Sequence, residues 1–168
     1  MRDRSLVSVL LLVLVGACSS SGADVLTGTW DYPLDQTQAQ LVVDNLAGLV
    51  DSAEAVVVRL GFDGSEYWQG FVFDGELFLL GGVPEGDGGR FEIEGDRIAM
   101  TGAHGDIRAT YTWETNGDEL TLVWVEQCDL PSQSEDCTDD RSRIEAEDPF
   151  VFIVMEHTFT KSSDDPDY

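Results

Sequence analysis

Residues 108–126 read RATYTWETNGDELTLVWVE, two runs of alternating apolar and polar side chains joined by Asn116-Gly117. Asn-Gly is the dipeptide that best tolerates the positive φ angles of a two-residue β-hairpin turn. A slip of one residue would move two tryptophans and a tyrosine from the apolar face into water. The stretch therefore predicts an antiparallel hairpin with one buried face.

A turn centred on Asn116 and Gly117 predicts which residues face one another across this hairpin. On the apolar face, the predicted pairs are Trp113 with Leu120, Tyr111 with Leu122, and Ala109 with Trp124. On the opposite face they are Thr112 with Thr121 and Glu114 with Glu119. That second face is expected to be wet.

From residue 55 onward, the chain repeats this pattern of short strands and turns. Turn signals stand at Asp63-Gly64, Asp74-Gly75, residues 84–89, Glu94-Gly95, His104-Gly105 and Asn116-Gly117. They are 9 to 12 residues apart, which leaves room for one strand between successive turns. The turn at Glu94-Gly95 would pair Phe91 with Ile98 and Glu92 with Arg97. Such regular punctuation predicts an antiparallel meander.

The two ends of the domain supply strands that would close this meander. Residues 25–32 contain Gly28-Thr29-Trp30 and stop at Pro33, and residues 150–160 form a last strand with two largely apolar faces. Pairing of residues 150–160 with 25–32 would remove both exposed sheet edges. The sequence thus predicts an all-β fold, a single antiparallel up-and-down β-barrel of about 8 to 10 strands.

One short helical segment is expected after the first strand, within residues 35–55. Val42, Leu46, Leu49 and Val50 recur at helical spacing, and Asp35 or Thr37 is available as the N-cap. Gly48 weakens a helix interior, so the segment is expected to bend or to divide into two short helices.

Residues 1–17 have the pattern of a signal peptide. Arg2 and Arg4 precede an apolar run over residues 6–15 that only Ser8 interrupts. Ten helical residues cover about 15 Å, half of a hydrocarbon core of roughly 30 Å, so this run is too short to span a membrane. It is typical of the apolar core of an export signal.

Val15-Gly16-Ala17-Cys18 resembles the lipobox of bacterial lipoproteins. The resemblance implies cleavage before Cys18 and lipidation of this cysteine, with residues 18–24 as a tethered linker. The mature protein would then lie on the extracytoplasmic face of the cell envelope, anchored to the membrane by lipid. The competing interpretation is ordinary secretion, with Cys18 as an incidental thiol.

Cys128 and Cys137 remain once Cys18 is assigned to lipid. Disulfides persist in exported proteins, and the segment between these two cysteines is polar and turn-forming. A disulfide between them is therefore expected, worth roughly 2–3 kcal/mol for so short a loop. A zinc site is the competing explanation, but no histidine stands nearby at ligand spacing.

The chain is strongly acidic, with 9 lysine and arginine residues against 33 aspartate and glutamate residues. Removal of residues 1–17 takes away two arginines and one aspartate, which changes the net charge from −24 to −25. Such a charge repels nucleic acids and anionic lipid head groups, so neither is an expected partner. No protein partner can be named from the sequence, and the acidic surface is expected to keep the domain soluble.

No pattern in the sequence predicts catalysis. A Gly-x-Ser-x-Gly nucleophile motif is absent, and His104 and His157 do not share a ligand spacing. Residues 136–147 are rich in oxygen ligands, but Arg141 stands where a calcium loop of the EF-hand kind needs glycine. We therefore expect no catalytic residues, no metal site and no cofactor, and a protein that is not an enzyme.

Three phrases of the sequence carry a resemblance to a family. Gly28-Thr29-Trp30 resembles the Gly-x-Trp signature of lipocalins and related calycins. FEIEGDRI at 91–98 and YTWETNGDELTL at 111–122 are similar to the paired hairpins of bacterial lipocalin-like domains. The helix after the first strand departs from lipocalins and is similar to fatty-acid-binding proteins. The resemblance implies a barrel that holds a small apolar ligand.

Six aromatic side chains are expected to point into the barrel: Trp30, Phe91, Tyr111, Trp113, Trp124 and Phe152. If they leave a cavity, residues 25–160 form a ligand-binding domain and these side chains line its site. If they fill the interior, the domain is a structural or protein-interaction module of the cell envelope. Residues 161–168 are polar and acidic, and we expect them to be a disordered tail.

Overall fold

The computed structural model describes residues 22–46, 55–79, 88–130, 136–147, 152 and 156–166. The predicted signal peptide, the lipobox with Cys18 and the following residues up to 21 lie outside the described residues. None of the described helices is both long and apolar enough to cross a membrane.

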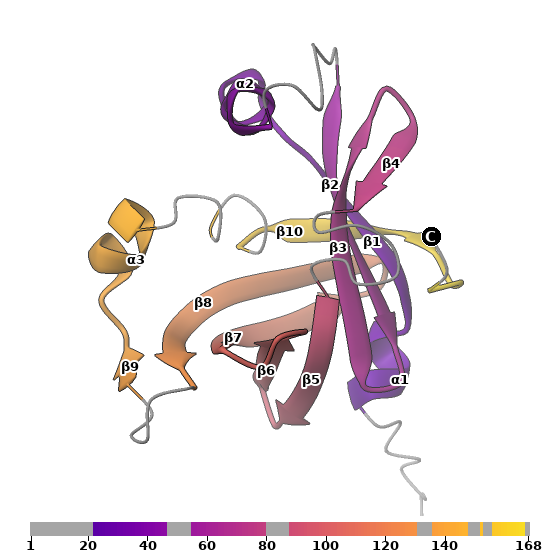
Figure 1. Ribbon diagram of the computed structural model, residues 1–168. Helices are drawn as coiled ribbons and strands as arrows, with labels where there is room; N and C mark the ends of the chain where they lie inside the picture. Colours follow the sequence, from indigo (N-terminus) through magenta and orange to yellow (C-terminus); the bar gives the residue numbers. More distant parts are fainter. Residues whose placement is uncertain are drawn as a thin grey trace, which may run out of the picture.

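Ten strands and three helices make up the described elements (Figure 1). In chain order they are α1 (Gly22–Leu26), β1 (Gly28–Pro33), α2 (Gln36–Asn45), β2 (Val56–Asp63), β3 (Glu66–Phe73), β4 (Glu76–Leu79), β5 (Gly88–Glu94), β6 (Arg97–Gly102), β7 (Ile107–Asn116), β8 (Glu119–Asp129), β9 (Asp136–Thr138), α3 (Arg141–Glu147) and β10 (Thr158–Ser163).

Eight of these strands form a closed antiparallel β-barrel. Seven follow one another as β1, β2, β3, β5, β6, β7 and β8, and β10 pairs with both β8 and β1 to complete the ring. Figure 1 shows β10 lying between these two strands. Strand β4 pairs only with β3, and β9 extends the far end of β8, so both lie outside the ring. The predicted all-β barrel is confirmed.

The closing strand begins later than the sequence pattern indicated. Phe152 has a helical backbone, and β10 runs from Thr158 to Ser163. Residues 150, 151 and 153–155 of the expected strand lie outside the described residues. In the seam with β1, Lys161 pairs with Trp30, and the hydroxyl groups of Thr29 and Ser162 are 3.1 Å apart.

The prediction of a disordered tail is wrong for residues 161–163, because they continue β10. Beyond the strand, the carbonyl oxygen of Pro166 accepts a hydrogen bond of 2.8 Å from the indole Nε1 of Trp68. The polar composition of this segment suits a seam whose side chains reach solvent, so composition alone did not distinguish it from a free end. Residues 167 and 168 lie outside the described residues.

The register of the central hairpin differs by two residues from the predicted one. Trp113 faces Leu122 and Tyr111 faces Trp124, whereas Asn116 is still in the strand and faces Glu119. The turn is centred on Gly117, which has φ of +64°, and Asp118. A two-residue shift keeps every side chain on its predicted face. A β-bulge after Thr110 then places Ala109 opposite Gln127 instead of Trp124.

The hairpin at Glu94-Gly95 shows the same shift. Gly95, with φ of +63°, takes the first central position of the turn, and Phe91 therefore pairs with Met100. Ile98 faces Ile93, and Arg97 faces Glu94. On the opposite face of the predicted pair, Glu92 faces Ala99. In both turns glycine occupies the first central position, where the prediction had placed it second.

Helix α1 replaces the expected start of the first strand. Val25 and Leu26 are helical, as are residues 22–24 at the end of the expected linker, and Leu26 is fully buried. The carbonyl oxygen of Leu26 accepts a hydrogen bond of 2.8 Å from the indole Nε1 of Trp30. This contact between residues four apart joins the end of α1 to β1.

Helix α2 forms where a helix was predicted and begins with Asp35 as its N-cap. The Asp35 carboxylate accepts from the backbone N–H groups of Thr37 and Gln38, and the side chain of Gln38 accepts from the N–H of Asp35. The helix ends at Asn45 with Val42 fully buried. The expected bend near Gly48 lies outside the described residues, which resume at 55.

Helix α3 was not predicted, and it occupies the segment that had been considered for a calcium loop. Two ion pairs with i,i+4 spacing stabilise it, from Arg141 to Glu145 and from Arg143 to Glu147. Just before it, β9 pairs with β8 so that Cys137 lies directly opposite Cys128. The predicted disulfide joins these two cysteines.

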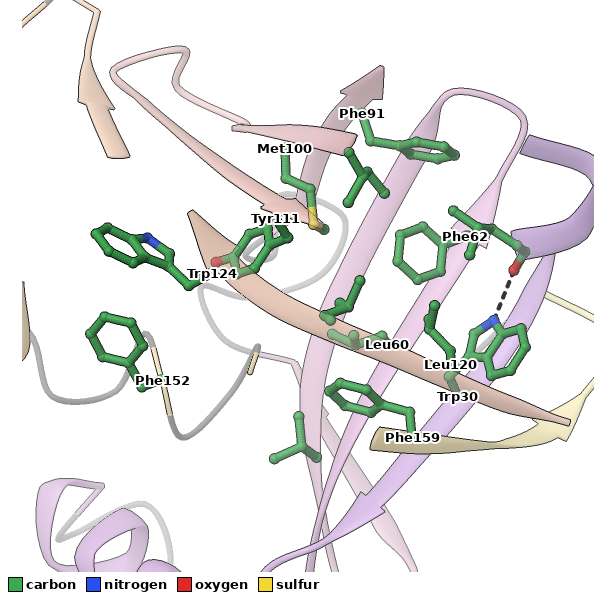
Figure 2. Packing of buried hydrophobic residues seen from close by; sticks show 14 of the residues in the cluster. Trp30, Leu60, Phe62, Phe91, Met100, Tyr111, Leu120, Trp124, Phe152 and Phe159 are labelled. Carbon is green, nitrogen blue, oxygen red and sulfur yellow. Dashed lines mark hydrogen bonds between the residues drawn. The ribbon is translucent and has the colours of Figure 1, made fainter. Parts of the chain in front are cut away.

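One apolar core lies between the barrel walls (Figure 2). Side chains from strands on either side of β3 meet there: the rings of Phe62 on β2 and Phe91 on β5 are 5.2 Å apart in an edge-to-face contact. Leu60, Leu120 and Phe159 are fully buried between them and the closing strand. Burial of this apolar surface is the main term that stabilises the ring.

Candidate functional site

The inner face of the β7–β8 hairpin carries the largest group of predicted site residues. Tyr111 and Trp113 come from β7, and Trp124 comes from β8. Alternation along each strand brings them to one face, together with the buried Leu120 and Leu122. Three of the six aromatic side chains named from the sequence are thus neighbours on one hairpin.

Burial of these six side chains is close to what the sequence predicts. Trp30, Phe91 and Tyr111 are almost inaccessible, and Trp124 and Phe152 are each 8% exposed. Trp113 is only half-buried, although it packs against the core. Trp30 and Phe91 lie on other strands, so the structure does not gather all six residues into one cluster.

Trp30 has a structural role at the seam of the barrel. Its N–H is satisfied by Leu26, and the ammonium group of Lys161 lies 5.4 Å from the centre of its ring. The side chain therefore links α1, β1 and β10. Because its N–H is bonded to Leu26 and its ring lies under Lys161, Trp30 has little freedom to contact a ligand.

A column of stacked side chains begins at Trp124. The ring of Phe152 meets Trp124 edge-to-face at 5.4 Å, and the guanidinium carbon of Arg141 lies 4.2 Å from the centre of the Phe152 ring. Arg141 also forms ion pairs with Glu145 and Glu156. Its charge is thereby balanced within the column, and these carboxylates hold the pKa of Arg141 above its usual value.

Tyr111 is a buried phenol beside this column. Burial raises its pKa well above the usual value, and the nearby acidic groups Tyr67 and Glu156 raise it further. The hydroxyl group thus stays protonated and neutral at any physiological pH. It offers one donor and its lone pairs rather than a negative charge.

Two buried indole N–H groups have no hydrogen-bond partner among the residues that the structure describes: those of Trp113 and Trp124. Buried polar atoms are nearly always paired, and an unpaired one needs an explanation. Both groups belong to the same hairpin face. This pair of donors is the most unusual feature of the barrel interior.

Some residues of this region could not be found from the sequence. Arg141 and Glu156 reach the column from segments on either side of Phe152, and Tyr32 stacks on His157 with ring centres 3.8 Å apart. Alternation of apolar and polar residues could not indicate these contacts, because they join residues far apart in sequence or lie in segments without such alternation. The one sequence feature that marks this region is the pair of arginines at 141 and 143.

Metal-binding groups are not gathered in the part of the chain that the structure describes. No three His, Cys, Asp or Glu side chains there are placed to hold a metal ion. His104 is exposed in the loop between β6 and β7, and His157 packs on Tyr32. Arg59 and Asp31 form a two-bond ion pair between β2 and β1, at 2.7 and 2.6 Å.

Comparison with known proteins adds no further guide. Neither a protein-family model, nor a curated protein, nor a solved structure matches this chain.

Proposed function

We propose that this protein is a lipoprotein, tethered at Cys18 to the extracytoplasmic face of a membrane, whose barrel binds a small apolar ligand. The observation that carries the ligand-binding part is the closed ring of eight antiparallel strands. Eight-stranded barrels have an interior that side chains fill or that holds one small ligand.

The position of α1 would make the tether short. This helix begins at Gly22, four residues after Cys18, and such a segment spans at most about 14 Å when extended. A lipid on Cys18 would therefore hold the barrel close to the bilayer surface. Ala23 and Leu26 pack against the core, so the tether would pull on a folded part of the domain.

The competing function is a structural or protein-interaction module with a filled barrel. It is favoured by the direct ring contacts inside the core, such as those between Phe62 and Phe91 and between Trp124 and Phe152. A filled interior would leave the outer surface as the functional part of the molecule. The two functions differ in whether the folded domain binds an apolar probe.

Ligand binding is tested with N-phenyl-1-naphthylamine, an uncharged apolar dye that fluoresces when it leaves water. The exported Cys18→Ser protein should bind it saturably, with one site per chain. Trp124→Ala should weaken binding, whereas Thr112→Ala, on the opposite face of the hairpin, should leave it unchanged. Absence of saturable binding to the folded protein contradicts ligand binding and leaves the interaction module.

Lipidation is tested separately by growing cells with an alkyne-bearing fatty acid. The wild-type protein should carry the label, and Cys18→Ser should abolish it. Cys137→Ser removes a cysteine of the disulfide and serves as the control that should still be labelled. Label that persists in Cys18→Ser would contradict the tether without bearing on ligand binding.

A further inference from the structure

One row of side chains crosses three strands at the open end of the β7–β8 hairpin. Arg108 on β7 pairs with Cys128 on β8, and Cys128 pairs with Cys137 on β9. Residues directly opposite one another on neighbouring strands project from the same face of the sheet. The guanidinium Nη2 of Arg108 donates to Sγ of Cys128 over 3.8 Å. The row therefore places a cation beside one sulfur of the disulfide.

The two cysteines of this bond differ in their exposure. Cys128 is completely buried, whereas Cys137 is exposed. A thiolate from solution therefore approaches the bond from the side of Cys137, and attack there expels Cys128 as the leaving thiolate. Burial makes such an anion costly, but a neighbouring guanidinium stabilises it, and exchange is faster when the leaving thiolate is stabilised. Arg108 stands where this stabilisation is needed.

The segment that the disulfide fastens lies outside the ring of the barrel. Strand β9 extends the sheet beyond β8, and α3 follows it along the chain. Figure 1 shows both elements to one side of the ring, beyond the end of β8. Three residue pairs join β9 to β8, and the middle pair is that of the two cysteines. Cleavage of the bond therefore removes no strand pairing from the ring.

Helix α3 covers the end of the aromatic column that begins at Trp124. Its Arg141 lies over the ring of Phe152, which packs on Trp124, and Ile144 is buried. The helix has seven residues, fewer than an isolated helix needs to be stable in water. The ion pair between Arg141 and Glu156 adds little, because the Arg141 side chain is 48% exposed. The position of α3 therefore depends on Ile144 and on the covalent link at the preceding strand.

We propose that the Cys128–Cys137 disulfide is a site of thiol–disulfide exchange with a dithiol reductant, and that its reduction releases β9 and α3 from the barrel. A thiolate of the reductant attacks Sγ of Cys137, which forms a mixed disulfide and expels the Cys128 thiolate beside Arg108. The second thiol of the reductant then displaces Cys137 and leaves the reductant as a disulfide. Two electrons and two protons pass to the protein. The exchange goes beyond the proposed function, since it requires neither the lipid nor a ligand.

The role of Arg108 is tested by the rate at which dithiothreitol reduces the exported Cys18→Ser protein. Thiols are alkylated after an acid quench and counted by mass spectrometry. Arg108→Gln should slow reduction about 3- to 10-fold, because it removes the charge beside the leaving thiolate. Arg97→Gln removes an equal charge at an exposed position of β6 and should leave the rate unchanged. A rate in Arg108→Gln equal to that of the parent, or above it, overturns the exchange site.

The direction of attack is tested without an arginine variant. The probe is 2-aminoethanethiol, a monothiol whose positive charge suits the acidic chain. After brief exposure, the protein is quenched in acid, unfolded and alkylated, and its peptides are mapped. The aminoethyl group should be on Cys137 and the alkyl group on Cys128. The reverse arrangement, or an equal mixture, overturns attack at Cys137.

Release of the segment is measured by hydrogen exchange of the oxidised and the reduced protein. Reduction should speed exchange of the amides in residues 136–147 about 10-fold or more and leave β6 and β7 unchanged. Cys137→Ser, at an exposed position, should show the same pattern without reductant. Unchanged exchange in residues 136–147 overturns the release. Faster exchange throughout the ring also overturns it, because the bond would then stabilise the whole fold.

Discussion

At the scale of single residues, Gly28 shows how closely the barrel seam is fitted. Its φ of +123° is a conformation that side-chain-bearing residues rarely adopt. A methyl group at this position would also overlap the carbonyl oxygen of Ser163 on the neighbouring strand. The glycine therefore permits both the backbone turn after α1 and the close approach of β10.

Tyr111 gives the barrel an expected sensitivity to alkali. The unfolded chain releases this proton near pH 10, while burial keeps the folded pKa higher. Above about pH 10 the unfolded state binds fewer protons than the native state, so stability falls by up to about 1.4 kcal/mol per pH unit. Urea unfolding between pH 9 and pH 11 should show this loss, and Tyr111→Phe should flatten it by one proton. An unchanged slope in Tyr111→Phe would mean that other groups cause the alkaline loss.

The sequence predicted which aromatic residues are buried but not what their polar atoms do. Apolar alternation is a local property, and it placed Trp30, Tyr111 and Trp124 inside correctly. Whether an indole N–H finds an acceptor depends on the fold: that of Trp68 donates to Pro166, 98 residues along the chain. The distinction between paired and unpaired tryptophans therefore needed the fold.

At the scale of elements, the β7–β8 hairpin allows a direct comparison of its two faces. Leu122 is 1% exposed and its neighbour Val123 is 47% exposed, on opposite faces of β8. Leu122→Ala should lower the free energy of unfolding by about 2–5 kcal/mol, because it leaves a cavity against Trp113. Val123→Ala should change it by less than about 0.5 kcal/mol. Urea denaturation measures both, and equal effects would mean that the faces are misassigned.

The faces of this hairpin were predictable from the sequence, but its register was not. Period-two alternation decides which side chains share a face, and a shift of two residues leaves that pattern unchanged. The register depends on which residue takes the first central position of the turn. Gly117 takes it, although the Asn-Gly dipeptide is usually placed at both central positions.

The two ends of the chain were the least predictable elements. Residues 25 and 26 have good strand formers yet belong to α1, and residues 161–163 are polar yet belong to β10. Partner strands far away in the sequence decide the conformation of β10, and α1 is held by the burial of Leu26 and the N–H of Trp30. The Asp35 capping box is local, and there the prediction was correct.

At the scale of the whole molecule, the net charge of −24 is expected to make stability depend on salt. Like charges repel one another in a compact chain, and salt screens them over a Debye length that falls from about 30 Å at 0.01 M to about 10 Å at 0.1 M. The urea midpoint should therefore rise with sodium chloride. Potassium chloride should give the same rise, since screening is not specific to the ion. A falling midpoint would mean that local ion pairs outweigh the repulsion.

Closure of the sheet was the part of the architecture that the sequence predicted best. A long meander of short strands leaves two bare edges, and pairing its ends removes them. That argument requires only the spacing of turns and an apolar strand near each end. The predicted pairing of the last strand with the first is confirmed between β10 and β1, but the argument could not foresee that β4 and β9 would lie outside the ring.

The bridging position of β10 also has a consequence for how the chain folds during and after its synthesis. Thr29 and Ser162, which meet in the seam, are separated by 133 residues, so the second of them is synthesised long after the first. Until then β1 waits with one side unpaired, open to strands of neighbouring nascent chains. A premature stop before Thr158 would make that waiting state permanent, with bare edges on both β1 and β8. Loss of β10 by chain termination would therefore leave the barrel open.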